Sequence, residues 1–325
     1  MKETRAPTEF GGDTLIWAAW MYYVDALTQN EIAQALGVSR ASVANYLAEA
    51  RRRGLVKIDL DPQLLAAVGR SRKLAQRFGL EGAFVAPDAG APTAVEDEVA
   101  LRRRLGAAAA QVLAPHMRPN RMIGMAWGRT MLELARATPE QSLPGLQVVQ
   151  VSGSSLGDAE SSPEACTALI AGRLGARCRN LYAPAVVTRR DVRDALLAEP
   201  TLQRHFERLR ACDIVVFGVG ELTRDVTWSD AEMLPGSIVE AYMDRGAVAI
   251  LIARFIAADG HEVRGPVSER HIGMALDDLL STPVRFCVAG GAAKYEAIRA
   301  TLAGGYATHL VTDAATARRL LEEAP

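Results

Sequence analysis

Short apolar runs alternate with helical patterns from about Leu80 to the C-terminus, and this alternation constrains the fold more than any other feature of the chain. Three of these runs end in glycine or a small polar residue. The seven runs are residues 82–87, 121–126, 146–151, 213–220, 248–255, 284–291 and 308–313. The helix candidates between them include Ala94–Met117, Pro163–Arg177 and Lys294–Leu302. Buried strands that alternate with helices predict a largely parallel sheet covered on both faces, a Rossmann-like α/β domain.

A stretch near the N-terminus carries the local signals of two short helices joined by a tight turn. Thr28 and Glu31 fit a T-x-x-E capping box, in which each side chain satisfies a backbone N–H of the first helical turn. Gly37 can adopt the left-handed conformation that ends a helix sharply. Ser39 is the next N-cap candidate, so a further helix is expected over residues 40–54.

Apolar positions predict how these helices pack. An amphipathic helix is expected ahead of them, with its apolar positions at Ile16, Trp20, Tyr23, Val24 and Leu27. The buried faces of the two following helices are expected to contain Ile32, Ala33, Leu36, Val43 and Leu47. This spacing predicts a helix-turn-helix.

A helix-turn-helix directs the N-terminal end of its second helix at the major groove of DNA. Arg40, Ser42 and Asn45 occupy that end, and arginine and asparagine can read guanine and adenine edges respectively. The arginines that follow are suited to phosphates. The expected DNA-binding residues are Thr28, Gln29, Ser39, Arg40, Ser42, Asn45, Arg51, Arg52, Arg53 and Lys57.

Positive charge is concentrated on this module. Residues 38–58 contain five cations and one acid, whereas residues 1–60 contain seven charges of each sign. This focus favours DNA binding; the alternative is an ordinary helix pair with a solvated arginine face. Residues 54–60 alternate apolar and polar side chains and predict a short wing strand, as in winged helix-turn-helix domains.

The chain as a whole is expected to form two domains, because 325 residues exceed the usual size of one core. The net charge of −1 carries no global nucleic-acid signal. The four cysteines have neither disulfide nor zinc-ligand spacing, and no apolar run is long enough for a signal peptide or a bilayer span. We therefore expect a cytoplasmic protein with no metal and no cofactor.

Three segments are expected: a helix-turn-helix domain over residues 1–60, a linker helix over 61–79, and an effector domain over 80–325. The linker helix begins at a proline. Its candidate buried positions are Leu64, Leu65, Val68 and Phe78. It is also a candidate dimer contact, because such modules commonly act in symmetric pairs.

Four strand ends carry residues suited to a ligand. Ligands of wound α/β sheets bind beyond the carboxyl ends of the strands, where glycines let backbone amides approach an anion. The four segments are residues 124–130, 152–157, 218–221 and 289–294. The expected effector-binding residues are Trp127, Gly128, Arg129, Thr130, Ser152, Gly153, Ser154, Gly218, Gly220, Glu221, Gly290, Gly291 and Lys294. Together they suggest a sugar, polyol or sugar-phosphate site.

Each of these features alone has a simpler interpretation. A glycine at a strand end can be only a turn, Lys294 can be a solvated helix residue, and Trp127 can be core instead of a platform for a sugar ring. No G-K-S/T phosphate loop is present and no G-x-G-x-x-G follows a strand, so nucleotide binding is not supported.

The motifs, taken in order, resemble a known family. The helix-turn-helix is followed by "GMAWGRT", "VVQVSGS", "RNLYAPAVV", "DIVVFGVGEL", "RFIAADG", "HIGMALDDL" and the C-terminal run that starts "VAGGAAKYEAIRATLAGGYATHLVTDAATARRLL". Over Thr14–Leu321 the chain resembles the SorC family of bacterial sugar-responsive transcriptional regulators. The resemblance implies an effector domain related to sugar-phosphate isomerases such as ribose-5-phosphate isomerase and glucosamine-6-phosphate deaminase, used for sensing.

The resemblance also implies roles for individual residues. Gly128, Arg129 and Thr130 would hold a phosphate or an equivalent oxygen, and Lys294 would contribute charge. It implies a tetramer whose affinity for DNA changes when a phosphorylated sugar binds.

The chain departs from the family pattern near the "RF" segment. Ala249, Ile250 and Ala257 stand where members commonly have a small-acidic pair and an aspartate. Because Ile250 cannot accept a sugar hydroxyl, the effector is expected to differ in its hydroxyl pattern or to be smaller or less polar, with Glu221 as a replacement acceptor.

The expected function is therefore a transcriptional regulator that binds double-stranded operator DNA as a dimer or tetramer under the control of a small carbohydrate or sugar phosphate, with no membrane partner. The alternative is an isomerase- or deaminase-like enzyme with an ancillary DNA-binding module. Such chemistry needs a positioned general base, and Glu221 is the only acid in the four strand-end segments. We therefore expect no enzyme activity; a ligandless scaffold is a third interpretation, which the loop glycines oppose.

Overall fold

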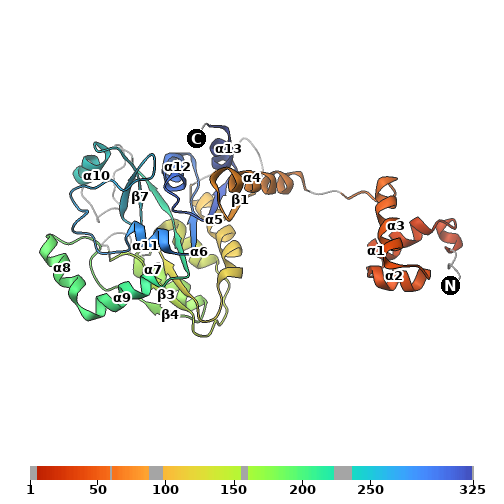
Figure 1. The fold of residues 1–325 in the computed structure, drawn as a ribbon, viewed down its shortest axis with the longest axis horizontal. Helices are drawn as coiled ribbons and strands as arrows, with labels where there is room; N and C mark the ends of the chain where they lie inside the picture. Colours follow the sequence, from red (N-terminus) through yellow and green to blue (C-terminus); the bar gives the residue numbers. More distant parts are fainter. Residues whose placement is uncertain (1–5, 59–60, 88–97, 155–159, 223–235, 324–325) are drawn as a thin grey trace. The chain divides into compact units, whose positions relative to one another are not determined.

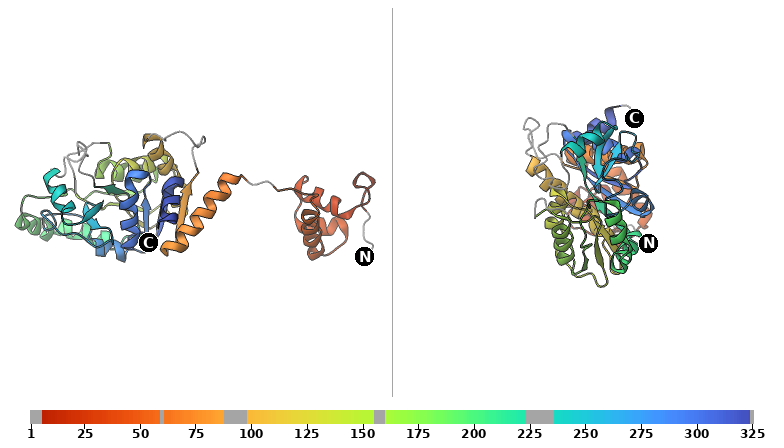
Figure 2. Two further views of the ribbon diagram at one scale, coloured as in Figure 1. Left: turned by 90° about the horizontal axis from the view of Figure 1, so that it is seen from above. Right: turned by 90° about the vertical axis from the view of Figure 1, so that its left-hand side faces the viewer.

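The computed structural model describes residues 6–58, 61–87, 98–154, 160–222 and 236–323. The chain divides into two compact units, Met1–Asp61 and Pro62–Pro325, which we call the N-terminal and the C-terminal unit. Figures 1 and 2 trace both, and each has a core of its own.

The N-terminal unit is helical. A 3-10 turn, η1 (Thr8–Phe10), precedes α1 (Thr14–Tyr23), α2 (Gln29–Leu36) and α3 (Arg40–Arg52). Its buried core consists of Ala18, Met21, Ile32, Ala33, Leu36, Val43 and Leu47. All five residues expected on the buried faces of α2 and α3 belong to this core, so the predicted helix-turn-helix is confirmed.

Helix α1 was predicted in the right place but with the wrong buried face. Ile16, Trp20, Tyr23 and Val24 are between 38% and 59% exposed, and Leu27 is only partly buried. The buried residues of α1 are instead Ala18, Ala19 and Met21. No residue of α1 is charged, so hydropathy alone does not select its inner face. Small alanines let α1 lie close to the helices beside it; Trp20, Tyr22 and Tyr23 stay exposed, and Trp17 packs partly buried against the core.

The predicted wing strand is absent from the described part of its segment. Residues 54–58 form turns and irregular structure, and residues 59–60 lie outside the described residues. Gly54 has a left-handed φ of 72°, which turns the chain away from the axis of α3. The alternating pattern there has no partner strand among the described residues of this unit, and a single strand cannot satisfy its backbone groups alone.

The C-terminal unit is built on a seven-stranded parallel sheet in the order β1-β10-β9-β5-β2-β3-β4. Its strands are β1 (Gly82–Ala86), β2 (Met122–Met125), β3 (Gln147–Gln150), β4 (Arg177–Arg179), β5 (Ile214–Phe217), β9 (Val284–Val288) and β10 (His309–Asp313). In the centre, Gly124 lies opposite Val149 on one side and Val215 on the other. The winding runs outward from β2 to β4 and then returns to β5, so its direction reverses between β2 and β5. The predicted Rossmann-like α/β fold is confirmed.

Helices cover both faces of this sheet (Figure 1). On one face lie α5 (Glu98–Leu113), α6 (Arg129–Ala137) and α7 (Pro163–Arg173). On the other lie α4 (Pro62–Phe78), α9 (Pro200–Arg210), α11 (Leu276–Ser281), α12 (Tyr295–Ala303) and α13 (Ala314–Glu322). Consecutive residues such as Val148 and Val149 point into opposite cores, as the pleat of a strand requires. None of the helices among the described residues is both long and apolar enough to cross a bilayer.

A second, three-stranded antiparallel sheet corrects two strand predictions, because it contains the end of the run 213–220 as β6 (Val219–Glu221) and the whole of the run 248–255. It has the order β6-β7-β8, with β7 (Ala247–Leu251) and β8 (Arg254–Ala257). Residues 248–255 were expected to form one strand of the parallel sheet, but they are a hairpin that turns at Ile252 and Ala253, whose φ angles are 48° and 59°. The apolar run contains none of the residues that usually mark such a turn, so the prediction was wrong.

Helix α4 occupies the segment expected to be a linker helix, and its contacts place it in the C-terminal unit against β1 and α13. Its buried residues are Ala67 and Leu74, whereas the predicted Leu64, Leu65 and Val68 are 45–52% exposed. Phe78 is partly buried against the core. The predicted buried face was therefore wrong over the first two turns of the helix.

The remaining helical elements are η2 (Ala114–His116), α8 (Arg190–Ala198), α10 (Gly236–Met243) and η3 (Ala292–Lys294). Helix α5 covers part of the expected Ala94–Met117 helix, and residues 94–97 lie outside the described residues.

Candidate DNA-binding surface and effector site

The turn between α2 and α3 is built as its residues predict. Thr28 and Glu31 form the complete capping box: the Glu31 carboxylate accepts the Thr28 N–H at 2.7 Å, and the Thr28 hydroxyl accepts the Glu31 N–H at 3.3 Å. Gly37 closes α2 with φ 69°, and the Ser39 hydroxyl caps α3 by accepting the Ser42 N–H at 3.1 Å. These local bonds set the angle at which α3 leaves α2.

The expected base-reading residues lie at the start of α3. Arg40 and Asn45 are exposed, and Ser42 is half-buried. The Ser42 hydroxyl lies 2.9 Å from the Ser39 hydroxyl, so it already takes part in the helix cap. The side chains at this end best placed to reach a base edge are therefore Arg40 and Asn45.

The basic end of α3 is partly neutralised by a neighbour on the same helix. Glu49 accepts two hydrogen bonds from Arg52, both at 2.8 Å, and one from Arg53 at 2.5 Å. These bonds lower the pKa of the Glu49 carboxyl, with the Arg53 bond as the main cause. The Arg51 Nε donates to the Leu47 carbonyl at 3.3 Å. Arg51, Arg52 and Arg53 are nonetheless exposed to solvent, so their charges remain at the surface.

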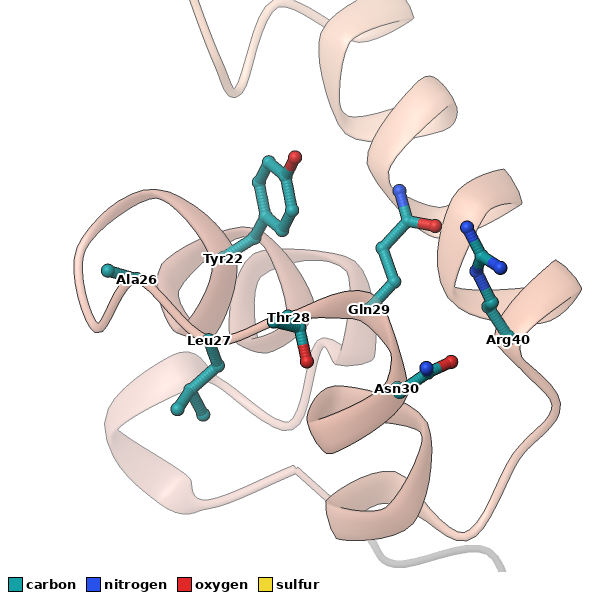
Figure 3. Close-up of a pocket in the computed structure, with 7 residues that line it drawn as sticks. All are labelled: Tyr22, Ala26, Leu27, Thr28, Gln29, Asn30 and Arg40. Carbon is teal, nitrogen blue, oxygen red and sulfur yellow. The ribbon is translucent and has the colours of Figure 1, made fainter. Parts of the chain in front are cut away.

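An open groove lies beside the start of α2 (Figure 3). Its lining consists of Tyr22, Ala26, Leu27, Thr28, Gln29, Asn30 and Arg40. It joins the N-terminus of α2, where backbone N–H groups carry partial positive charge, to the guanidinium at the start of α3. This combination suits a DNA phosphate. Sequence reasoning missed Tyr22 and Asn30; the position of Asn30 in the first turn of α2 was the available signal.

In the C-terminal unit, the four expected ligand segments meet at one edge of the sheet. They follow β9, β5, β2 and β3, which are four consecutive neighbours in the strand order. All four strands are parallel, so their carboxyl ends lie at the same edge. The reversal between β2 and β5 falls in the middle of this set, where wound sheets bind ligands.

The segment after β2 turns into α6 at Gly128. Gly128 has φ 107°, which side chains rarely tolerate, and its N–H donates to the Ser161 carbonyl at 3.0 Å. The N-cap residue of α6 is Gly128, which has no side chain to cap the helix, so the N–H groups of the first turn are oriented as in helix N-termini that bind anions. Arg129 is exposed and Thr130 is buried in that turn, while Trp127 packs partly buried against the core.

The segment after β3 is more tightly packed than expected. A Cβ on Gly153 would lie 2.6 Å from the main chain at Ala183 and Ala185, and the Gly153 N–H donates to the Ile272 carbonyl at 3.0 Å. This glycine therefore serves packing, and its amide is not available to an anion. Ser152 is fully buried. Residues 155–157 of this segment lie outside the described residues.

The segment after β3 takes part in a polar network that sequence reasoning missed. Glu164, in the first turn of α7, accepts hydrogen bonds from Ser154 and from the amide of buried Gln150, the latter at 3.2 Å. The Gln150 amide also donates to the Ser152 carbonyl at 2.7 Å. Glu164 and Gln150 are 14 residues apart on different elements, so only the tertiary structure could bring them together.

The segment after β5 contains β6, which is a strand of the small antiparallel sheet. Gly220 lies opposite Ile250, and a Cβ on Gly220 would approach the Ile250 side chain to 2.4 Å. The glycine is thus needed because Ile250 packs over it. Gly218 has ordinary space around it, and the nearest atom to a Cβ there is the Val288 carbonyl at 3.6 Å.

The segment after β9 is fixed by a hydrogen bond to a carboxylate. The Gly291 N–H donates to Asp313 at 2.7 Å and to Thr316 at 3.0 Å, so this amide does not face an anion. A Cβ on Gly290 would meet the same carboxylate at 2.3 Å. Asp313, at the end of β10, was not among the expected residues.

Lys294 and Glu221 meet across two of these segments, with Nζ 4.0 Å from Oε2. Both side chains are about 30% exposed, at 28% and 31%. Desolvation lowers the pKa of Lys294; the charges of Arg129 and Arg102 act in the same direction and Glu221 opposes them. The charges of Arg129 and Arg102 therefore act on Lys294, and Arg102 is itself paired with Glu98 at 2.9 Å. Arg102 was missed, because within the "LRRRL" run of α5 nothing distinguishes it from a solvated arginine.

Comparison with protein families supports the same two regions. Residues 64–322 match the family described as a putative sugar-binding domain. Residues 20–53 match region 4 of sigma-70, a model that here falls on α2 and α3.

The chain is 30% identical over 312 residues to an uncharacterized transcriptional regulator, YjhU, of Escherichia coli, covering 96% of this chain and 95% of that protein. It is also 30% identical over 309 residues to the transcriptional regulator LsrR of Klebsiella pneumoniae, covering 93% and 91%. Its fold resembles that of the full-length sorbitol operon regulator SorC from Klebsiella pneumoniae, with a TM-score of 0.75 at 24% identity over 95% of this chain and 98% of that one.

Proposed function

The chain belongs to the SorC-type family of sugar-responsive, DNA-binding transcriptional regulators, and from this premise we propose how its two units divide that function. The N-terminal unit binds operator DNA, and a carbohydrate or sugar phosphate bound at the shared strand edge of the C-terminal unit changes the affinity of that binding. The protein acts in the cytoplasm as a homo-oligomer, and the strand edge senses its ligand without converting it.

The observation that carries the effector site is the convergence of four strand ends beside cationic side chains. Gly128 and the first turn of α6 supply a phosphate position, and Arg129, Arg102 and Lys294 supply charge. The effector-binding residues we propose are Trp127, Gly128, Arg129, Thr130, Ser152, Ser154, Gly218, Gly220, Glu221, Gly290 and Lys294. Gly153 and Gly291 contribute to the shape of the site, because their own amides are bonded within the protein.

The apolar side chain of Ile250 bears on which effector fits. It packs over Gly220, next to the ion pair of Glu221 with Lys294. We propose that the effector places a less hydroxylated part against Ile250 and a hydroxyl against Glu221.

On the DNA side, Arg40 and Asn45 read bases, and the groove at the start of α2 receives a phosphate. The remaining proposed DNA contacts are Thr28, Gln29, Ser39, Ser42, Arg51, Arg52, Arg53 and Lys57. Residues 1–60 form the DNA-binding part, residues 61–79 the connection and residues 80–325 the effector part. Pairs of chains place two recognition helices on adjacent half-sites, and the effector alters how the chains pair.

A single pair of titrations tests this proposal. Full-length protein is titrated with duplex DNA from its own promoter region at rising salt, with and without a panel of sugar phosphates, polyol phosphates and inorganic phosphate. We expect DNA affinity to fall by about 10³ between about 50 and 200 mM salt, because many phosphates are contacted. At least one panel member should raise the melting temperature and shift DNA affinity without being converted. Turnover of that compound, or DNA affinity unaffected by every compound that binds, would contradict the proposal.

A further inference from the structure

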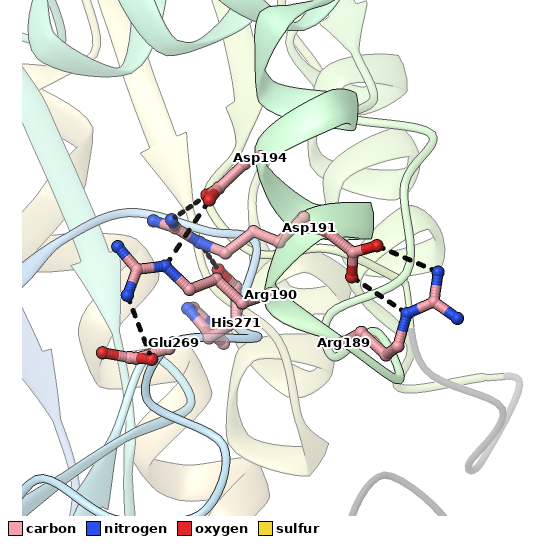
Figure 4. Close-up of polar contacts among 7 residues, drawn as sticks. Arg189, Arg190, Asp191, Asp194, Glu269 and His271 are labelled. Carbon is pink, nitrogen blue, oxygen red and sulfur yellow. Dashed lines mark hydrogen bonds and ion pairs between the residues drawn. The ribbon is translucent and has the colours of Figure 1, made fainter.

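His271 is a buried histidine whose ring has no hydrogen-bond partner among the described residues. It is only 2% exposed, and both Nδ1 and Nε2 lack a partner. Its carbonyl, in contrast, accepts from Arg193 Nε at 3.0 Å. Arg193 belongs to a charged network on α8 that reaches the same segment through Arg190 and Glu269 (Figure 4). The main chain of His271 is thus fixed, while its ring is left unsatisfied, which is costly in a buried position.

The segment around His271 lies between two other segments beyond the end of β3. Gly273 forms an antiparallel bridge with Ser152, and His271 forms one with Val186. The Ile272 N–H donates to the Ala185 carbonyl at 2.8 Å. Residues opposite each other in antiparallel pairing share a face, and neighbours along a strand alternate. His271 and Ser152 therefore lie on one face of this three-segment layer, while Ile272 points into the hydrophobic cluster on the other.

Gly273 leaves the space that the ring of His271 occupies. A Cβ at this glycine would lie 2.6 Å from His271 Cε1 and 3.2 Å from Ser152 Cα. The imidazole consequently extends across Gly273 toward Ser152. The Ser152 hydroxyl is itself fully buried and has no partner in the described part of the chain. An unsatisfied imidazole thus packs over Gly273, whose paired residue Ser152 carries an unsatisfied hydroxyl, at one of the four strand ends of the effector site.

The charge around His271 decides what chemistry it offers. Burial, with the nearby cations Arg254 and Arg193, holds the pKa of His271 well below its ordinary value. Among the described residues no acid contributes to this shift, and Arg254 and Arg193 are themselves paired with Glu262 and Asp194. The ring is therefore neutral at physiological pH, with one nitrogen that donates and one that accepts. A neutral donor–acceptor pair beside a serine hydroxyl complements a ligand hydroxyl, whereas the two arginines oppose a cationic group.

We propose that His271 and Ser152 form a hydroxyl-binding subsite of the effector site, which selects a carbohydrate that carries a hydroxyl at this point over its deoxy analogue. This inference rests on the proposed function, because it takes the end of β3 as part of the effector site. The deoxy analogue is disfavoured because it leaves both buried groups unpaired.

The test compares three full-length variants with the wild type: His271→Phe, Ser152→Ala and the control His205→Phe. His205 is also a buried histidine, but its Nε2 is 2.8 Å from the Gln150 carbonyl, so its ring is satisfied within the protein. Melting temperature without ligand is measured first. His205→Phe should lower it, and His271→Phe should leave it unchanged or raise it, because phenylalanine removes two unpaired polar atoms.

Affinity is then measured for inorganic phosphate, for the panel of sugar and polyol phosphates, and for singly deoxygenated analogues of the tightest-binding member. His271→Phe should lower the affinity for that member about tenfold and leave the affinity for inorganic phosphate unchanged. The deoxy analogue that lacks the hydroxyl bound by His271 should have the same affinity for the wild type and for His271→Phe. Ser152→Ala should show the same pattern more weakly, and it tests the subsite even if His271→Phe does not fold.

Two outcomes would overturn the inference, and they are distinguishable. If the panel member binds both variants as tightly as the wild type, the subsite is wrong while the proposed effector site stands. If no panel member binds the wild type, the proposed function fails and the subsite fails with it.

Discussion

The two units of the chain assemble their candidate binding groups in different ways. In the N-terminal unit, the residues from Thr28 to Lys57 lie on two successive helices and the residues around them, so consecutive turns of chain present them together. In the C-terminal unit, Gly128 and Lys294 are distant in sequence, and each stands where a separate strand ends. Local rules of capping and helical spacing build the first site, whereas sheet topology builds the second.

The electrostatics of the two sites differ accordingly. Arg52 and Arg53 are exposed and share the half-buried Glu49 at the surface, where ion pairs are weak and easily exchanged for phosphate. Lys294 is partly buried beside Glu221, with a lowered pKa. An exposed, exchangeable surface suits a long polyanion, and a partly desolvated amine suits one small ligand with defined geometry.

The largest effect should come from comparing one alanine substitution in each site. Arg40→Ala should lower DNA affinity about tenfold or more, because it removes a base or phosphate contact, and should leave effector affinity unchanged. Thr130→Ala should do the reverse, with about a tenfold loss in effector affinity from one hydrogen bond to a charged group. DNA binding by fluorescence anisotropy and effector binding by calorimetry measure both. Equal loss of DNA affinity in the two variants would remove the distinction between the units.

A pH series should separate the lysine site from the arginine surface. The protonated amine of Lys294 attracts a phosphate, so effector affinity is complete below its lowered pKa and falls as the pH rises through it, earlier than for an ordinary lysine. DNA affinity, which depends on arginines that stay charged, should remain flat over the same range. Lys294→Arg should keep effector affinity constant up to pH of about 10, and Lys294→Met should weaken it several-fold at every pH. A wild-type profile identical to that of Lys294→Arg would exclude this lysine from the site.

The smallest effect should follow from releasing the arginines of α3. Glu49→Gln removes the negative charge that pairs with Arg52 and Arg53 and should tighten DNA binding about two- to fivefold at low salt, with a steeper salt dependence. Glu9→Gln is the matched control, because Glu9 is an exposed acid in η1, away from α3 in sequence. Equal changes in the two variants would mean that only net charge matters, and that the pairing on α3 does not regulate contact with DNA.

The sequence was informative where a signal depends on neighbours along the chain. The capping box at Thr28, the turn at Gly37 and the buried positions from Ile32 to Leu47 were all predicted correctly, because each depends on spacing within one or two helical turns. Predictions failed where the partner surface decided the outcome. Trp20 of α1 and Leu65 of α4 have the spacing of core residues, yet they are exposed because alanines on the other face pack inward.

In the effector site, the sequence identified the right segments but not the function of each amide or side chain. It placed glycines at four strand ends, but only the folded chain shows that the amides of Gly153 and Gly291 are already bonded. Glu164, Arg102 and His271 left no signal, because a carboxylate, an arginine in a basic run and a histidine in a polar stretch are ordinary surface residues until other segments surround them.

The amino-acid sequence by itself determined the helix-turn-helix, the alternation of strands and helices, and membership of a regulator family, because these follow from periodicity, caps and motifs read within short windows. Tertiary structure decided which strands became neighbours, that β7 and β8 form a separate hairpin, that Lys294 meets Glu221, and that the ring of His271 packs over Gly273. The physical reason is that the burial and the hydrogen bonds of a side chain depend on its environment in the folded protein. Distant segments assemble that environment, and no short window of the sequence contains it.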